Sequence, residues 1–365
     1  MSDLPVDLEE EILSRVPTTS LKRLRSTCKR WNALRFSEKH LCKAPKQSHV
    51  LMFKEYYRLC PMSVDLNVVP PSIGFKDALS LKNAHSNSGQ VDIAQVFHCD
   101  GLLLCITKID NKPVIWNPCL GESRWIKHEN GYDRNCEFAL GYANNQSCRS
   151  YRVLRFYQTD DLVVAGPEIY EFNSNSWRVV NAPNCLRICK KYRGVTLKGS
   201  TYWLFYDGDK DSDYLLSFDF TREIFRRLHL STSRDYYMAL SVVRQEELSV
   251  LIESIGSYEL EIWVTKKIDT EAEFSWSKSF AVDLRNTPRN VLSSVFMISF
   301  LIDEEKKVAL CCSSSFAIRR TVVFTLGEDD EYAKVLYEKE IRFLPSGLYW
   351  RPFIFNYVPN LVQIQ

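Results

Sequence analysis

The spacing of hydrophobic residues along the chain changes near residue 45. Before that point apolar residues recur three to four positions apart, which is the spacing of one face of an α-helix. One stripe comprises Leu8, Ile12, Leu13 and Val16, and a second comprises Leu21, Leu24, Cys28 and Trp31. Pro17 separates the two predicted helices, because the residue before a proline avoids the helical conformation. Helices this short bury too little apolar surface to be stable alone, so their stripes need a partner in this chain or another.

Beyond residue 45 the helical spacing disappears. Short runs rich in Val, Ile, Phe, Tyr and Trp alternate with turn residues, which is typical of β-strands. One unit, an apolar run, a polar turn and a second run with an aromatic residue, recurs at 114–126, 168–180, 215–228, 260–277 and 321–337. A further hairpin-like pair precedes the unit, as at the turn Lys198-Gly199-Ser200, so each repeat is predicted to hold four strands.

Four-stranded repeats of about 40–50 residues are typical of β-propeller blades. Five such blades cover about 95–340, and the strand-like runs at 49–66 and 353–363 are expected to close a sixth blade from both ends. The predicted fold class is therefore α+β multidomain. A helical module at residues 1–45 precedes an all-β domain at residues 46–365, which is a β-propeller of about six blades. A β-sandwich or an irregular all-β domain is the alternative.

Glycine is scarce for a domain with so many hairpins, with 13 glycines in 365 residues. The predicted turns carry Asn, Asp, Ser, Thr, Lys and Glu instead, and Asn and Asp tolerate the left-handed turn conformation. The net charge of +2 argues against a nucleic-acid-binding domain, which is usually strongly basic. That balance conceals an acidic segment at residues 1–11 followed by a basic one at residues 15–43.

Candidate catalytic and metal-binding residues are scattered. The 12 cysteines and six histidines show no spacing typical of a metal or redox site. His98, Cys99 and Asp100 are adjacent, but neighbours along a strand point to opposite faces of the sheet. We therefore expect buried or incidental thiols, no catalytic residue, no metal site and no cofactor. Most of the eight tryptophans lie in predicted strands, where they are expected to pack between blades.

The N-terminus does not resemble a secretory signal, because no basic segment is followed by an apolar run. No stretch approaches the roughly 18 apolar residues of a transmembrane helix. We therefore expect the protein in the nucleus or the cytoplasm, with reduced cysteines and no membrane partner.

The first 40 residues or so resemble the F-box motif. The matching features are Leu4-Pro5, the Ile12-Leu13 pair, Pro17 in the middle and the closing Lys29-Arg30-Trp31. The resemblance implies a trihelical module that docks on a Skp-type adaptor and through it on a cullin–RING ubiquitin ligase. The adaptor-binding residues that it implies are Leu4, Pro5, Leu8, Ile12, Leu13, Val16, Pro17, Leu21, Leu24, Cys28 and Trp31.

The remainder of the chain resembles the kelch-related F-box-associated domain of plant proteins. Characteristic phrases are Ile115-Trp116-Asn117-Pro118, Ser176-Trp177-Arg178 and Tyr357-Val358-Pro359, without the double glycines of true kelch repeats. The resemblance implies target recognition by this domain.

The two resemblances together imply the substrate-recognition subunit of an SCF-type (Skp–cullin–F-box) E3 ubiquitin ligase. Such a subunit recruits an unknown protein target for ubiquitination and proteasomal degradation and is itself non-catalytic, with no nucleic-acid partner. Two alternatives stay open. One is an F-box adaptor partner or scaffold that acts outside a ubiquitin ligase. The other is a propeller enzyme resembling the copper oxidases, which needs clustered His and Tyr ligands.

Overall fold

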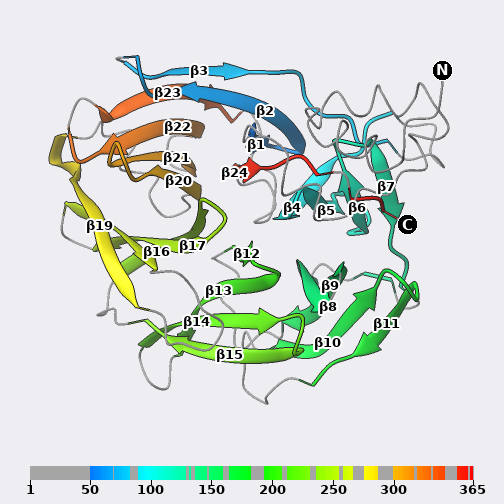
Figure 1. The fold of residues 1–365 in the computed structure, drawn as a ribbon. Helices are drawn as coiled ribbons and strands as arrows, with labels where there is room; N and C mark the ends of the chain where they lie inside the picture. Colours follow the sequence, from blue (N-terminus) through cyan, green and yellow to red (C-terminus); the bar gives the residue numbers. More distant parts are fainter. Residues whose placement is uncertain are drawn as a thin grey trace, which may run out of the picture.

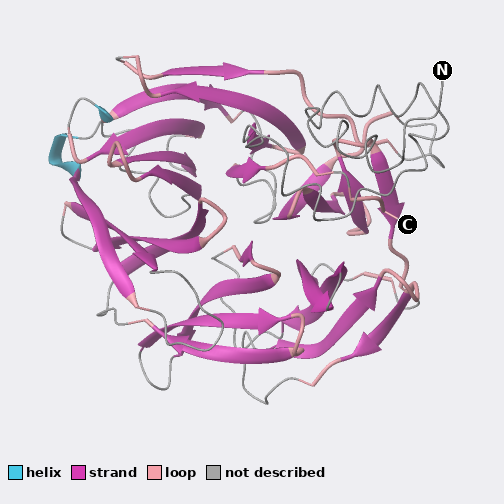
Figure 2. Ribbon diagram, viewed as in Figure 1, coloured by secondary structure: helices cyan, strands magenta, loops and turns pink. Residues whose placement is uncertain are grey.

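The described part of the chain is built almost entirely from β-strands. The computed structural model describes residues 50–68, 70–82, 89–128, 131–132, 136–145, 148–158, 164–181, 193–207, 212–230, 236–254, 258–265, 275–286, 299–315, 319–329, 332–341, 352–360 and 362–364. These residues form 24 strands and one 3₁₀ helix, η1 (Leu284–Asn286) (Figure 2). Within these ranges no helix has the length and apolar character needed to cross a membrane. The helices predicted within residues 1–45 fall outside them.

The strands form six four-stranded antiparallel sheets, which are arranged as blades around a central axis (Figure 1). The first blade combines both ends of the domain, in the order β24 (Phe353–Tyr357), β1 (Val50–Glu55), β2 (Arg58–Asp65) and β3 (Ser72–Phe75). Strand β24 pairs along the whole of β1 except its last residue, from Val50 opposite Tyr357 to Lys54 opposite Phe353. The predicted closure of the sixth blade from both ends of the chain is therefore confirmed.

The other five blades each use four consecutive strands, from the axis outwards. The second and third blades comprise β4 (Ile93–Cys99), β5 (Leu102–Thr107), β6 (Pro113–Asn117), β7 (Glu122–Trp125), β8 (Cys136–Asn145), β9 (Cys148–Gln158), β10 (Val164–Glu171) and β11 (Ser176–Val179). The fourth blade comprises β12 (Val195–Leu197), β13 (Ser200–Asp207), β14 (Ser212–Asp219) and β15 (Ile224–His229). The fifth and sixth blades comprise β16 (Tyr236–Val243), β17 (Glu247–Ser254), β18 (Glu259–Thr265), β19 (Trp276–Asp283), β20 (Ser299–Asp303), β21 (Val308–Ser315), β22 (Arg320–Gly327) and β23 (Lys334–Glu340).

Hydrophobic packing between the blades explains the apolar runs in the sequence. The described core divides into six clusters, and each cluster fills the junction between two neighbouring blades. Along β5, Leu103 and Cys105 pack towards the first blade, whereas Leu102, Leu104 and Ile106 pack towards the third. Both faces of a middle strand are thus covered, which selects a continuous apolar run instead of alternation. Outer strands such as β11 border solvent and stay partly exposed.

The C-terminal residues continue past β24 and cross the second blade. The side-chain amide of Asn117 donates hydrogen bonds to the carbonyl oxygens of Asn360 (2.9 Å) and Val362 (2.8 Å). The Asn360 amide in turn donates to the carbonyl of Asp100 (2.6 Å). Gly101 lies under this crossing with a φ of +78°, and a Cβ atom there would lie 2.4 Å from the carbonyl oxygen of Val358. Only glycine fits both the conformation and the space.

More types of residue adopt a positive φ in the turns than the sequence indicates. Among described non-glycine residues with positive φ, Asp100, Asn111 and Asn175 match the expectation that Asn and Asp occupy these positions. The other such residues are Tyr56, Lys198, Glu223, Arg244, Gln245, Lys307 and Arg319. Of these, Lys198, Glu223 and Lys307 are also of the residue types expected in the turns, whereas Tyr56, Arg244, Gln245 and Arg319 are not. Pairing of the flanking strands over their whole length outweighs a local conformational cost of about 1–2 kcal/mol.

Most predicted strands are confirmed, including both strands of all five recurring units. The hairpin of β8 and β9 is the further pair expected before the unit at 168–180, and its ten register pairs make it the longest in the molecule's described part. The six tryptophans in the described ranges all lie in strands, as expected. They are Trp116, Trp125, Trp177, Trp203, Trp263 and Trp276.

Replacement of Gly101 tests how strongly the C-terminal crossing stabilises the ring. We expect Gly101→Ala to lower the free energy of unfolding by about 1–3 kcal/mol, because it combines backbone strain with a clash against Val358. Gly89→Ala is the matched control, since nothing lies within 4 Å of its added Cβ. Urea denaturation of both variants measures the difference. Equal midpoints would show that the crossing carries no stability.

Candidate functional site

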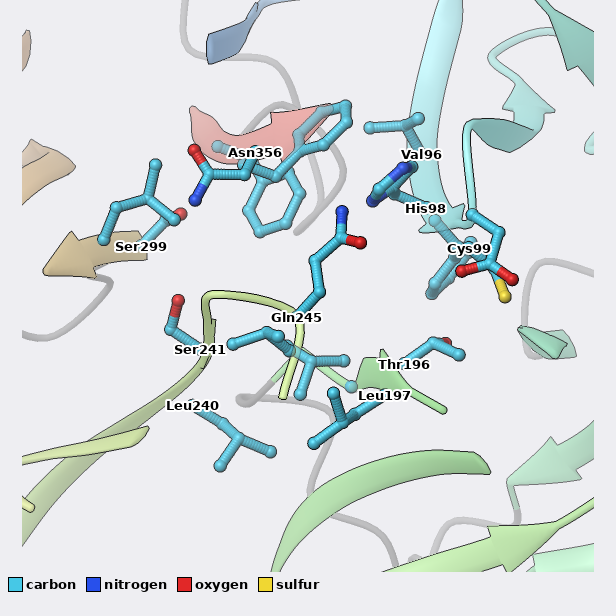
Figure 3. A pocket seen from close by; sticks show the side chains of 18 of the residues that line it. Val96, His98, Cys99, Thr196, Leu197, Leu240, Ser241, Gln245, Ser299 and Asn356 are labelled. Atoms are coloured by element: carbon cyan, nitrogen blue, oxygen red, sulfur yellow. The ribbon is translucent and has the colours of Figure 1, made fainter. Parts of the chain in front are cut away.

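A cavity on the axis of the propeller is a candidate binding site. The eleven predicted adaptor-binding residues, from Leu4 to Trp31, lie outside the described ranges, so their arrangement stays a prediction. The cavity has a volume of about 240 Å³ and is lined by residues of all six blades (Figure 3). Its walls come from the innermost strand of every blade, namely β24, β4, β8, β12, β16 and β20.

The cavity lining consists of consecutive residues instead of alternate ones. The runs are 96–100, 194–198, 240–242, 299–301 and 353–356. Each innermost strand is the end strand of its sheet, so its axial edge has no strand neighbour in that sheet. Such an edge presents backbone N–H and C=O groups, whatever the side chains are. The innermost strands therefore contribute both backbone and side chains to the wall of the cavity.

Polar side chains concentrate at the end of the cavity where the innermost strands lead into their first turns. Asp100 follows β4, Lys198 follows β12 and Gln245 lies in the turn after β16. Arg149, near the start of β9, donates to the Asp100 carboxylate at 2.6 Å. In Figure 3 the Gln245 side chain extends into the cavity between Asn356 and His98.

The opposite end of the ring is crossed by Arg193, which lies two residues before the start of β12. Its guanidinium donates to the carbonyl oxygen of Val96 on β4 at 2.6 Å. It also lies 4.0 Å from the centre of the Phe353 ring on β24, within the range of a cation–π contact. This one side chain therefore connects the fourth blade with the first and second blades across the axis.

His98 borders the cavity and is otherwise enclosed by protein. Its ring packs 5.5 Å from the ring centre of Phe355 and 5.6 Å from that of Tyr357, whereas Cys99 packs in the cluster on the other side of β4. The predicted separation of these two neighbours onto opposite faces is confirmed. The Nε2 atom accepts a hydrogen bond from the Gly101 N–H at 3.0 Å, which assigns the ring proton to Nδ1. Burial lowers the pKa of His98 to about 4, so the imidazole is neutral at physiological pH.

The cysteines of the described ranges are structural. Cys99, Cys105, Cys136, Cys311 and Cys312 are buried, and Cys60 and Cys119 are partly so. Burial raises the pKa of the Cys99 and Cys312 thiols well above the usual value, which suppresses the thiolate needed for nucleophilic chemistry. The described residues hold no group of three or more His, Cys, Asp or Glu side chains placed to bind a metal ion.

Sequence reasoning missed the cavity residues, although it identified the strands that carry them. Hydrophobic periodicity reports which side chains pack between blades and carries no information about a backbone edge. The available signal was positional, because the cavity strands are the first strands of the repeats. Lys198, Gln245 and Asn356 were not candidates for that reason.

Titration of His98 gives a prediction about acid stability. Because burial lowers its pKa to about 4 from the ordinary 6.5, the unfolded chain binds a proton between these values while the folded protein does not. Its contribution to stability is therefore lost as the pH falls from 6.5 towards 4. Between pH 7 and pH 5 we expect the free energy of unfolding of His98→Phe to fall by about 2 kcal/mol less than that of the wild type. Thermal or urea unfolding at both pH values measures this, and equal losses would contradict the assignment.

Each half of the chain matches a known protein family. The family described as "F-box domain" matches residues 1–34, and the family described as "F-box associated beta propeller domain" matches residues 49–364. The chain is 48% identical to "Putative F-box only protein 9" of Arabidopsis thaliana, over 100% of this chain and 96% of that protein. It is 52% identical to "F-box protein At3g22700" of the same plant, over 86% and 93% of the two chains.

A relative with a kelch-type name and a solved structure are also similar to this chain. "Putative F-box/kelch-repeat protein At3g22730" of Arabidopsis thaliana is 48% identical over 100% of this chain and 97% of that protein. Among solved structures, a chain of "Crystal structure of Nidogen/Laminin Complex" is similar with a TM-score of 0.43 and 11% identity, over 86% and 99% of the two chains. The family matches span nearly all of the sequence. The chain therefore belongs to the F-box proteins that carry an F-box-associated β-propeller domain.

Proposed function

We propose that this protein is the substrate-recognition subunit of an SCF-type E3 ubiquitin ligase in the cytosol or nucleus. The observation that carries the proposal is the combination, in one chain, of an F-box match at residues 1–34 with a closed six-bladed ring. F-box domains generally bind Skp-type adaptors, and the ring offers a rigid surface and an axial cavity to a second partner. The target would then be recruited for ubiquitination and proteasomal degradation.

The strand at which the chain enters the ring suits an adaptor. The chain that follows the F-box enters the ring at β1, which lies between β24 and β2 inside its sheet. A force applied through the F-box therefore acts on a strand that is hydrogen-bonded along both edges. Such an interior strand resists displacement better than an edge strand would. A fixed geometry matters, because a ligase of this kind acts by holding a target lysine near a carrier-bound ubiquitin.

In this mechanism the chain supplies binding and orientation and no reacting group. The buried thiols and the neutral, enclosed His98 fit a structural role for the groups that could otherwise act as nucleophile or base. An F-box adaptor or scaffold that acts outside a ubiquitin ligase is the alternative. Recovery of a Skp-type adaptor without any cullin would favour it.

Adaptor binding can be tested at the predicted F-box contacts. We expect Leu13→Asp to reduce co-purification of a Skp-type adaptor and a cullin at least tenfold, because it places a carboxylate in the apolar docking stripe. Affinity purification of tagged full-length protein from plant cells, followed by immunoblotting, measures both partners.

Val179→Asp is the matched control for this test. It introduces the same charge at a propeller residue that is 72% exposed, so adaptor recovery should stay at the wild-type level. Intact binding by Leu13→Asp would refute the site assignment. If the wild-type protein recovers the adaptor without any cullin, the ligase function itself is refuted.

A further inference from the structure

Several uncharged polar groups at the axial cavity do not use their hydrogen-bonding capacity on the protein. Gln245 and Asn356 carry amides, and Ser241 carries a hydroxyl. The neutral His98 ring, whose Nε2 is bonded to Gly101, carries its proton on Nδ1. Within the described residues, no partner is found for the three side chains or for this imidazole N–H. Enclosed polar groups normally pair with protein, water or a ligand, so these groups point to a ligand or to water in the cavity.

The four groups come from three blades and face one space. Asn356 lies on β24 of the first blade, and His98 lies on β4 of the second. Ser241 lies on β16 of the fifth blade, and Gln245 lies in the turn after it. Figure 3 shows the Gln245 side chain between Asn356 and His98. Closure of the ring therefore assembles one set of uncharged donors and acceptors from distant segments.

The rest of the lining is partly apolar. Val96 on β4 and Leu197 on β12 border the same space (Figure 3). Pockets for small molecules typically combine apolar walls with a few placed polar groups. The volume of about 240 Å³ lies below the roughly 300–1,000 Å³ of sites for drug-sized ligands, which limits a ligand to roughly ten non-hydrogen atoms.

An extended peptide or a helix does not fit this cavity. The Ser299 hydroxyl accepts a hydrogen bond from the N–H of Ile354 and donates one to its carbonyl oxygen, both at 3.0 Å. This part of the β24 edge is therefore already paired, and a peptide main chain gains nothing from it. A helix of about 10–12 Å diameter is too wide for the space. What the cavity admits is a small molecule.

The charged side chains described around the cavity are bound to other groups or are exposed. The Arg149 guanidinium is bound to the Asp100 carboxylate at 2.6 Å. The Arg193 guanidinium donates to the Val96 carbonyl at the opposite end of the ring. Lys198 is exposed, so water and salt screen its charge. A charged ligand would therefore lose its hydration without gaining a counter-ion, whereas an uncharged ligand loses much less.

We propose that the axial cavity binds an uncharged small molecule in which an amide-like group is attached to an apolar group. The amides of Gln245 and Asn356 each present a donor and an acceptor, which match the N–H and C=O of such a ligand. Its apolar part lies against Val96 and Leu197. This inference goes beyond the proposed function and does not depend on it, because it concerns a ligand of the ring alone.

Four compounds that share a phenyl ring test the inference. Benzamide is uncharged and carries an amide, benzoate is an anion, benzamidine is a cation, and ethylbenzene has no hydrogen-bonding group. Titrations followed by saturation-transfer NMR measure their dissociation constants with the full-length protein in complex with a Skp-type adaptor. Benzamide should bind about tenfold more tightly than each of the other three, which corresponds to one or two hydrogen bonds or one unpaired charge.

Variants of the cavity locate the bound compound. Gln245→Glu keeps the shape of an exposed side chain and replaces its amide with a carboxylate. We expect this variant to bind benzamidine about tenfold more tightly than the wild type does, because a charged hydrogen bond forms, and to bind benzamide more weakly. Asn356→Leu should weaken benzamide binding about tenfold. Gln363→Glu is the matched control, because it makes the same change at an exposed residue away from the cavity.

Four outcomes would overturn the inference. Failure of benzamide to bind would assign the cavity to water only. Equal binding of benzamide and ethylbenzene would leave an apolar site, and tighter binding of benzoate would show that the cationic side chains select the ligand. Benzamide binding that survives both Gln245→Glu and Asn356→Leu would place the compound elsewhere. Urea denaturation checks that the variants are folded. The gain of benzamidine binding by Gln245→Glu is a result that unfolding does not produce.

Discussion

The structure depends on closure of the ring by β24 against β1. A four-stranded blade has two apolar faces, and each face is buried only when another blade lies against it. In an open array of six blades, the first and the last would each expose one face. Pairing of Val50–Lys54 with residues 353–357 places both ends of the domain in one sheet, which brings the first and sixth blades together. The C-terminal residues extend this closure onto the second blade through Asn117 and Asn360.

The axial cavity is a geometric consequence of the same closure. Because side chains of the innermost strands pack sideways into the six junctions, few of them remain to fill the axis, and the strand edges border it instead. Long polar side chains line the cavity mainly at its ends, where turns place Lys198, Gln245 and the Asp100–Arg149 pair. Arg193 connects three blades across the other end. The fold thus creates a cavity of mixed polar and apolar lining without a contiguous motif.

The two halves of the protein divide their tasks in a way that their physical chemistry explains. The sequence of the F-box predicts apolar stripes that need a partner, whereas the ring has already buried its own apolar faces between blades. What the ring leaves exposed is strand edge, turn and charge, which suit selective recognition of a second chain. The described chain enters the ring at β1, which is an interior strand of its sheet.

The sequence by itself determined the strands of the recurring units, the six-bladed ring and the membership of the F-box family. These depend on local features, namely apolar runs, turns and a linear motif that can be read residue by residue. It did not indicate that residues such as Tyr56 and Arg244 adopt the left-handed conformation, because strand pairing overrides local preference there. Only the tertiary structure decided the cavity and the environment of His98. The residues that form them come from segments up to about 260 residues apart, and the ring's closure alone brings them together.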